Sequence, residues 1–237
     1  NGVAQVYRRA GGAWTLQQTL TRPHAFPGDR FGTAIEWDGR TLVIGSPGNP
    51  SGSDGAIVIY EPVNGAFVWR QTIDVPAGEP NFGLRISLNR GRMAVSATVG
   101  FSTTNAVYLF KRDSSGLWAQ QAHLVPPQEE EDQFGIAIDL RGRRLIAGAD
   151  QSTGRYALIY KEADGQWQQE ARLDTTAVLS SFGRGVEIRR NRAWVGDPHS
   201  RTFHEYQRGS GTWSLTSTTS NPNEGFFAGA LHLLGRE

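Results

Sequence analysis

The stretch FGTAIEWDGRTLVIGSP, residues 31–47, decides the fold of this chain. A Phe-Gly pair opens a run of alternating apolar and polar residues. A two-residue turn follows at Asp38-Gly39, and a second apolar run ends in Gly-Ser-Pro. Alternation with a period of two, over short runs bounded by turn residues, is typical of β-strands. The stretch therefore predicts two antiparallel strands joined by a tight turn.

Variants of this stretch recur along the chain at intervals of about 50 residues, a period typical of repeat architectures. A second marker, a Trp that opens a short polar run, recurs out of phase with the first. The Phe-Gly copies begin at Phe31, Phe82, Phe134 and Phe182, with a degenerate copy at Phe227. The Trp markers are Trp14, Trp69, Trp118, Trp167 and Trp213. Five copies of each marker indicate five units.

Each full unit contains four short runs with the period of a strand. First strands are expected at 31–37, 82–88, 134–140 and 182–188, and second strands at 42–46, 93–97, 145–149 and 193–196. Third strands are expected at 56–60, 106–110, 156–160 and 202–206, and a fourth strand begins near each Trp. No segment long enough for a helix shows the helical period. Four antiparallel strands repeated in this way fit the blade of a β-propeller.

The two ends of the chain predict a blade shared between the termini. The chain opens with a third strand (3–7) and a fourth strand (14–20), and it closes with a first strand (227–233). Residues 1–30 would thus complete the blade begun at 227, whose second strand is missing. The prediction is an all-β fold, a β-propeller of five four-stranded antiparallel blades that forms a single domain over 1–237.

Composition narrows the possible partners. The chain has 24 basic and 23 acidic side chains and a net charge of +1, so we expect no nucleic-acid partner. No apolar run reaches the roughly 18 residues of a membrane span, so we expect no membrane insertion. The absence of cysteine excludes disulfides and Cys-ligated metal sites. No leader peptide is recognisable at the start, which suggests a mature form or a piece of a larger chain or assembly.

The repeat resembles the FG-GAP repeat, which is named for Phe-Gly and Gly-Ala-Pro. Gly-Ser-Pro at 45–47 carries the resemblance, with weaker counterparts at 96–98, 148–150 and 196–198. The resemblance implies the propeller of integrin α-subunits and of related extracellular or cell-surface proteins, whose rings usually have seven blades rather than five. Many such blades hold calcium between their first and second strands. Here those turns are short and basic, so we expect neither a metal site nor a cofactor.

The long connections predict the binding face. In propellers the loops from second to third strand and from fourth to the next first strand share one face, and irregular loops commonly carry binding residues. We therefore expect a non-catalytic binding or adhesion module that recognises a carbohydrate or protein ligand there. The candidate residues are His24, Phe26, Asp29, Asn49, Asp54, Phe101, Asp150, Gln151, Asp197 and His199.

Two alternatives remain open. Asp150 and Asp197 end the second strands of adjacent units, and paired carboxylates near a propeller axis could perform acid–base chemistry on a carbohydrate. The propeller could instead be a protein-binding scaffold in a larger assembly. No nucleophile elbow and no phosphate-binding loop accompany either possibility.

Overall fold

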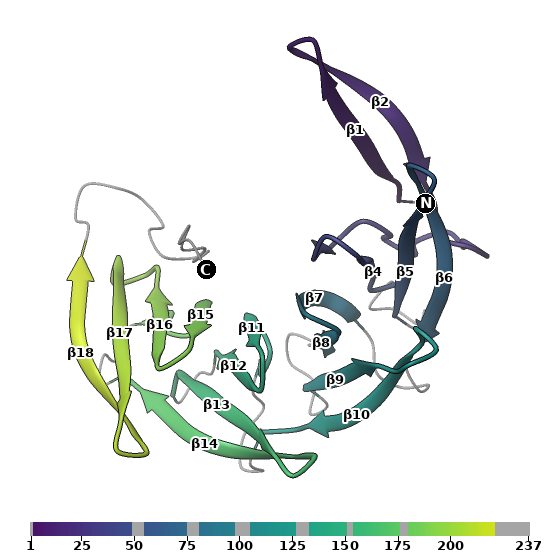
Figure 1. Ribbon diagram of the computed structural model, residues 1–237. Helices are drawn as coiled ribbons and strands as arrows, with labels where there is room; N and C mark the ends of the chain where they lie inside the picture. Colours follow the sequence, from purple (N-terminus) through teal and green to yellow (C-terminus); the bar gives the residue numbers. More distant parts are fainter. Residues whose placement is uncertain are drawn as a thin grey trace.

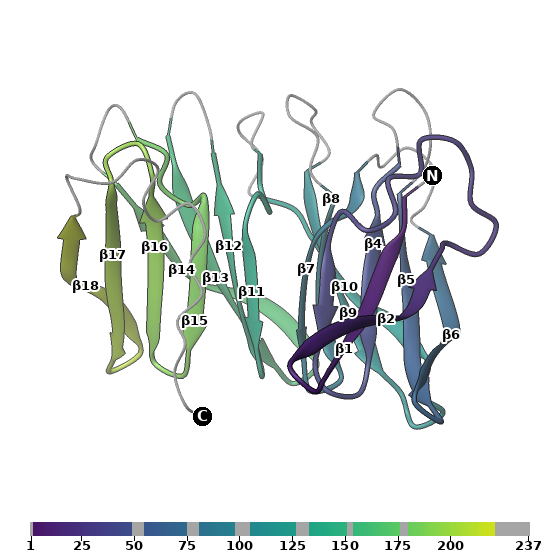
Figure 2. The same ribbon diagram turned by 90° about the horizontal axis from the view of Figure 1, so that it is seen from above.

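The computed structural model describes residues 2–48, 55–74, 81–97, 105–126, 133–150, 154–175 and 180–220. These residues contain eighteen strands and no helix. The strands form four four-stranded sheets and one two-stranded sheet, all antiparallel, and consecutive strands lie side by side. Figure 1 shows the sheets arranged as the blades of an open arc around an axis, and Figure 2 shows the strands standing next to one another from blade to blade.

The blades follow the chain in order. The N-terminal hairpin consists of β1 (Ala4–Ala10) and β2 (Ala13–Leu20). The first blade contains β3 (Ile35–Trp37), β4 (Leu42–Ser46), β5 (Ala56–Val63) and β6 (Ala66–Asp74). The second contains β7 (Phe82–Asn89), β8 (Arg92–Ala97), β9 (Ala106–Arg112) and β10 (Trp118–Leu124). The third contains β11 (Ile138–Arg141), β12 (Arg144–Ala149), β13 (Tyr156–Ala163) and β14 (Gln166–Asp174). The fourth contains β15 (Gly185–Arg189), β16 (Arg192–Asp197), β17 (Thr202–Gly209) and β18 (Thr212–Ser220).

This architecture confirms the predicted all-β propeller with five blades. The N-terminal hairpin forms a two-stranded sheet, and its β-bulge matches the one between the third and fourth strands of the first blade, which agrees with the place predicted for it in the fifth blade. The copy at 227–233, which was expected to supply its first strand, lies outside the described residues.

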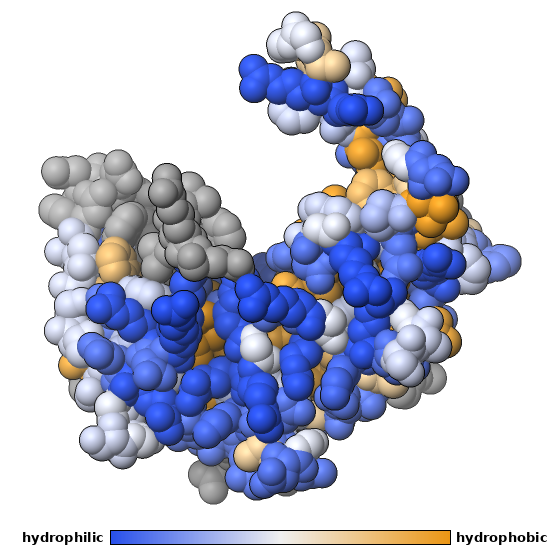
Figure 3. All heavy atoms as spheres, in the orientation of Figure 1, coloured by the Kyte–Doolittle hydropathy of each residue, from blue (hydrophilic) through white to orange (hydrophobic). Residues whose placement is uncertain are grey.

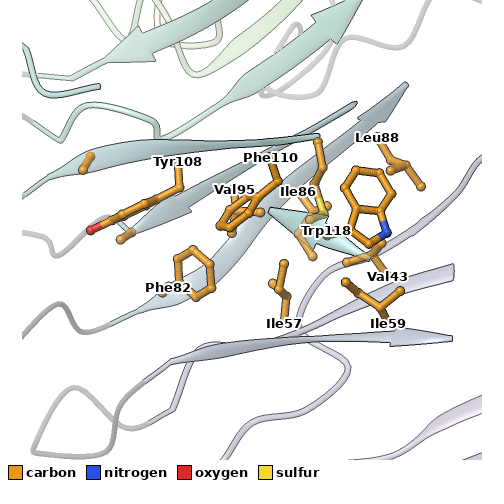
Figure 4. Packing of buried hydrophobic residues seen from close by; sticks show 13 residues of the cluster. Val43, Ile57, Ile59, Phe82, Ile86, Leu88, Val95, Tyr108, Phe110 and Trp118 are labelled. Atoms are coloured by element: carbon orange, nitrogen blue, oxygen red, sulfur yellow. The ribbon is translucent and has the colours of Figure 1, made fainter. Parts of the chain in front are cut away.

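The core lies between blades. Val43, Ile57 and Ile59 of the first blade pack against Phe82 and Ile86 of the second, as Figure 4 shows. Three similar clusters join the second blade to the third, the third to the fourth, and the hairpin to the first. Each large apolar side chain buried in this way contributes about 1.5–3 kcal/mol, so neighbouring blades hold each other in place.

The glycine of the Phe-Gly pair forms a hydrogen bond with the glycine near the end of the second strand of the same blade. Gly32 donates its N–H to the carbonyl of Gly45 at 2.9 Å, and Gly135 does the same to Gly148 at 2.9 Å. Gly32 and Gly135 have φ values of 96° and 82°, which non-glycine residues rarely adopt. Because the Phe-Gly pair forms this turn, β3 and β11 each begin four residues later than predicted.

The pairing of the outer strands shows that the Trp markers do not all occupy equivalent positions, which differs from the prediction. Trp118 pairs with Arg112, whereas Trp69 pairs with Tyr60, whose counterpart in the second blade is Phe110. The counterpart of Trp118 in the first blade is therefore Phe67, which pairs with Pro62, two residues before Trp69. Trp69 therefore does not occupy the position equivalent to that of Trp118, contrary to the alignment of the Trp markers. It is 50% exposed.

Glutamine side chains join successive outer strands. The Phe67 N–H donates to Gln18 Oε1 at 2.9 Å, and Gln18 Nε2 donates to the Phe67 carbonyl at 2.8 Å. The Gln71 amide bonds the N–H and carbonyl of Trp118 in the same way, at 2.9 and 3.1 Å. Each glutamine follows a β-bulge in its strand, which directs the side chain to the next blade.

Candidate functional site

Four polar side chains occupy equivalent positions on the innermost strands. Each is the fifth residue after the Phe of its Phe-Gly pair: Glu36 on β3, Ser87 on β7, Asp139 on β11 and Glu187 on β15. The inner strands surround the propeller axis (Figure 1). Their alternation directs these four side chains toward the next blade, while the flanking apolar residues face the previous one.

Two of these side chains bond the backbone of the neighbouring inner strand. Leu140 donates its N–H to Ser87 Oγ at 2.9 Å, and Ile188 donates its N–H to Asp139 Oδ2 at 2.8 Å. In the turn between β11 and β12, Gly142 donates its N–H to Asn89 Oδ1 at 2.9 Å. Adjacent inner strands belong to different sheets, so these bonds satisfy backbone groups that no ladder reaches.

The inner strands enclose an axial pocket of about 450 Å³. This volume lies within the range of small-molecule binding sites. The pocket lies where the inner strands run into their short turns. Its polar lining consists of Glu36, Asp38, Ser87, Asn89, Arg90, Asp139, Arg141 and Glu187. Trp37, Ile86, Leu88, Ile138 and Val186 complete it.

The carboxylates of the axial pocket differ in how they are satisfied. Arg189 Nε donates to Glu187 at 2.6 Å, and Arg141 Nε lies 3.4 Å from Asp139 Oδ1. Asp38 accepts the N–H groups of Arg40 and Thr41 and thereby closes its turn. Within the part of the chain that the structure describes, the half-buried Glu36 carboxyl has no hydrogen-bond partner. Glu36 is thus the acid in this pocket that is available to a ligand.

Burial raises the pKa of Glu36 to about 7. The positive charge of Arg141 lowers this pKa and the negative charge of Asp139 raises it, both less than burial does. Burial also raises the pKa of Asp139, against the N–H bond from Ile188 and the charge of Arg141. The Glu36 carboxyl is therefore poised to exchange a proton near neutral pH.

This raised pKa predicts how Glu36 contributes to stability. The folded protein binds the Glu36 proton more tightly than the unfolded chain does, so the contribution is full below about pH 4.5 and is lost as pH rises through about 7. After allowance for solvent screening we expect about 1–2 kcal/mol. The melting temperature of Glu36→Gln relative to the unsubstituted chain should therefore rise by about 2–6 °C between pH 5 and pH 8. A difference that stays flat over this range would contradict the assignment.

The structure places Asp150 in a double ion pair. Arg155 Nε donates to Asp150 Oδ1 at 2.7 Å, and Arg184 Nε donates to Asp150 Oδ2 at 2.7 Å. Asp150 directly follows β12, and Arg184 lies just before β15, so the pair ties the third blade to the fourth. Both carboxylate oxygens are occupied, which favours a structural role.

Asp197 is buried and caps the Phe182 turn. Its carboxylate accepts Ser180 Oγ at 2.7 Å and the N–H groups of Ser181 and Ser200 at 2.6 and 3.2 Å. Burial raises the pKa of Asp197, but these hydrogen bonds outweigh it and hold the pKa below its ordinary value. A carboxylate held ionised in this way is a poor proton donor, so the structure does not favour Asp150 and Asp197 as an acid–base pair.

Three of the predicted site residues, His24, Phe26 and Asp29, lie in the loop before β3. Asp29 is buried, and its Oδ1 accepts the N–H groups of Gly2 and Phe31. The Arg22 guanidinium lies 4.7 Å from the centre of the half-buried Phe26 ring. His24 is exposed, as is His199 on the fourth blade.

None of the predicted loop residues that the structure describes, which are His24, Phe26, Asp29, Asp150, Asp197 and His199, lines the axial pocket. Asn49, Asp54, Phe101 and Gln151 lie outside the described residues, and the loop face remains a prediction. The axial set was missed because each polar residue, taken alone, resembles the solvent-facing half of an alternating strand. A comparison of the fifth residue after each Phe would have found it, since all four copies are polar there.

Two further findings concern the described residues alone. They contain no group of three His, Cys, Asp or Glu side chains arranged to hold a metal ion. They also contain no helix long and apolar enough to cross a membrane.

Comparison with known proteins agrees with the fold. Residues 14–60 match the model of the FG-GAP repeat. A candidate 6-phosphogluconolactonase from Bacteroides fragilis superposes with a TM-score of 0.59 at 10% identity, over 89% of this chain and 60% of that one. A second candidate 6-phosphogluconolactonase, from Bacteroides uniformis, superposes with a TM-score of 0.62 at 11% identity, over 90% of this chain and 61% of that one.

The chain thus spans about 60% of the length of these solved structures, and at such identities the likeness shows the fold alone. No curated protein matches the sequence. The matched repeat, the recurring Phe-Gly turns and the blades around one axis agree with one another. The chain is an all-β protein of propeller fold that carries an FG-GAP repeat.

Proposed function

We propose that the chain is a non-catalytic carbohydrate-binding module that works outside the cell. The axial pocket holds the ligand. The match to the FG-GAP repeat, which is typical of extracellular propellers, supports the extracellular location. Residues of four successive blades line the pocket, so a ligand seated there contacts the whole arc.

One observation carries this proposal: an available carboxyl group faces a pocket that also holds hydrogen-bond donors. Glu36 has no partner among the described residues, and Arg90, Arg141 and Asn89 line the same space. Sugar hydroxyls both donate and accept, so neighbouring hydroxyls on a ring can bond a carboxylate and a guanidinium together.

The charge of the pocket favours a neutral sugar over a phosphosugar. Four acidic side chains, those of Glu36, Asp38, Asp139 and Glu187, line it beside two arginines. Like charges raise the cost of bringing a phosphate into a pocket with an acidic excess. The solved neighbours are named as candidate enzymes for a phosphorylated sugar acid lactone, and this pocket does not favour that substrate.

A glycan array with the 237-residue chain, followed by calorimetry on each hit, tests the proposal. Because a hydrogen bond to a charged group contributes about 1.5–3 kcal/mol, Glu36→Gln should weaken binding about tenfold or more at pH 8, where the carboxylate is ionised. Asp164→Asn changes an exposed acid in the turn between β13 and β14 and should leave the affinity unchanged. Asn89→Ala should also weaken binding.

Two results would contradict the axial site. One is glycan binding that survives Glu36→Gln and Asn89→Ala but is lost in His199→Ala, which would place the ligand on the loop face. The other is the absence of any glycan hit, with binding only to a protein partner.

A second function, hydrolysis of a glycosidic bond or ester, is favoured by the pKa of Glu36 alone. A carboxyl with a pKa of about 7 suits a general acid. Incubation of the chain with each glycan hit would show products if this function holds, and Glu36→Gln would abolish them. Binding without products identifies the module as non-catalytic.

A further inference from the structure

The turns between the first and second strands of the blades carry an excess of arginine. These turns, residues 38–41, 89–92, 141–144 and 189–192, contain nine arginines and one acid, Asp38. The whole chain has 24 basic and 23 acidic side chains, so the other residues carry seven more acids than bases. Positive charge is thus concentrated in one set of turns of a nearly neutral chain, an arrangement that solubility alone does not require.

These four turns form one side of the arc, which we call the turn face. They lie at its lower edge in Figure 2, and Figure 3 shows the same side from the front, with strongly hydrophilic side chains over successive blades. Two lysines extend the turn face, because Lys111 pairs with Arg92 and Lys161 pairs with Arg144 at the starts of the second strands β8 and β12. The turn face therefore carries basic residues from each of the four complete blades.

Half-buried arginines of the turn face hold neighbouring blades together. Arg92 of the second blade forms an ion pair with Glu162 of the third at 2.7 Å, and Arg144 of the third blade donates to the Arg190 carbonyl of the fourth. Arg144 also donates through Nε and Nη2 to both carboxylate oxygens of Glu170, at 2.8 and 3.2 Å. These contacts explain part of the arginine excess and show an arginine of this face binding a carboxylate at two points.

Four other cations of the turn face are exposed and belong to four different blades. Arg40, Lys111, Lys161 and Arg190 form no ion pair within the ranges that the structure describes. The one acid of the four turns, Asp38, already accepts backbone N–H groups within its own turn. These four cations are therefore available to an anionic partner that spans several blades.

The turn face borders the axial pocket, because Arg90 and Arg141 of these turns also line that pocket. The exposed acids Asp113 and Asp164 lie in the hairpins between third and fourth strands, further from the axis. Asp113 accepts the Ser115 hydroxyl and the Leu117 N–H within its own hairpin. A sugar chain that leaves the pocket would thus meet the basic turns first.

We propose that the turn face binds an acidic polysaccharide that contains uronic acid units. The inference rests on the axial pocket as a sugar site and adds the class of glycan: the pocket holds a neutral unit, and the basic turns bind the carboxylates of neighbouring units. Arginine forms two parallel hydrogen bonds with a carboxylate. Single exposed ion pairs are weak, so the affinity depends on several acidic units that bind different blades at once.

A partly methyl-esterified oligogalacturonate, which contains neutral and charged units, provides the probe. The fully esterified oligomer of the same length is its neutral control. Calorimetry with the 237-residue chain should show that the partly esterified oligomer binds about tenfold or more tightly than the neutral one. This preference should shrink when the salt concentration rises from about 50 to about 500 mM, because salt screens exposed charges.

Paired substitutions locate the effect on the turn face. Arg40→Gln combined with Arg190→Gln should lower the preference for the charged oligomer about fivefold, and so should Lys111→Gln combined with Lys161→Gln. The matched control combines Arg30→Gln in the loop before β3 with Arg201→Gln before β17, both exposed. It removes the same two charges from the chain and should leave the preference unchanged.

Several results would overturn the proposal. These are equal binding of the two oligomers, binding of neither, or an equal loss in the control variant. Polyglutamate or single-stranded DNA that binds as tightly as the charged oligomer would show general anion binding and would also overturn it. Failure of the axial site gives a different result: Glu36→Gln would then leave the affinity for both oligomers unchanged, while the charge preference and its loss in the turn-face variants remain.

Discussion

Replacing Gly148 with alanine is expected to lower the free energy of unfolding by about 3–4 kcal/mol, a large effect for one methyl group. The added Cβ would lie 1.9 Å from the carbonyl oxygen of Gly183, which belongs to the next blade. This neighbour is backbone, so it cannot turn aside as a flexible side chain could. The third and fourth blades must separate, and their shared cluster of Ile146, Ile159 and other buried residues loosens with them.

Urea denaturation measures this effect as a lower midpoint with an unchanged slope. The matched control is Gly209→Ala at the end of β17, where no heavy atom lies within 4 Å of the new Cβ and φ is not positive. It should change stability by no more than about 0.5 kcal/mol. Equal losses in the two variants would show that the contact between blades does not explain the motif glycine.

Phe134→Ala is expected to cost about 3–5 kcal/mol, the usual range for a buried phenylalanine. Phe134 is fully buried and lies edge-on to Tyr160 at 6.2 Å between ring centres. Its cluster includes Val107 and Leu109 of the second blade, so the loss again falls on the contact between two blades.

Trp14→Ala provides the comparison, since Trp14 belongs to the other aromatic marker of the repeat and is 66% exposed. We expect a change within about 0.5 kcal/mol for a surface position of this kind. Thermal denaturation of both variants would separate the two markers. A loss at Trp14 as large as that at Phe134 would contradict the burial of one and the exposure of the other.

These two aromatic markers also show which features of the fold can be predicted from the sequence. Buried phenylalanines and alternating runs follow from the pattern itself, which is why the blades and their order could be predicted. The Trp positions could not, because their burial depends on the neighbouring blade and on register. Trp118 packs into the cluster with the first blade, whereas Trp14 faces the side of the hairpin where no described residue packs. In the first blade Phe67 takes the buried position, and a shift of two residues leaves Trp69 outside.

The candidate site was harder to predict than the fold. Long loops drew attention to Asp150 and Asp197, yet the structure satisfies both carboxylates within their own turns and ion pairs. Glu36 shares its alternating strand with many exposed residues, and its sequence neighbours give no sign of a pocket. Only the meeting of four inner strands at one axis brings Glu36, Asp139 and Arg141 together.

The clusters between blades have a consequence for how the molecule opens. Each cluster joins two neighbouring blades and no others, so the free energy of the fold is close to a sum over adjacent pairs. Loss of one cluster should therefore separate one pair of blades and leave the other clusters in place. The axial pocket, which draws on four blades, would then lose a wall when a single blade detaches, well before the remaining sheets unfold.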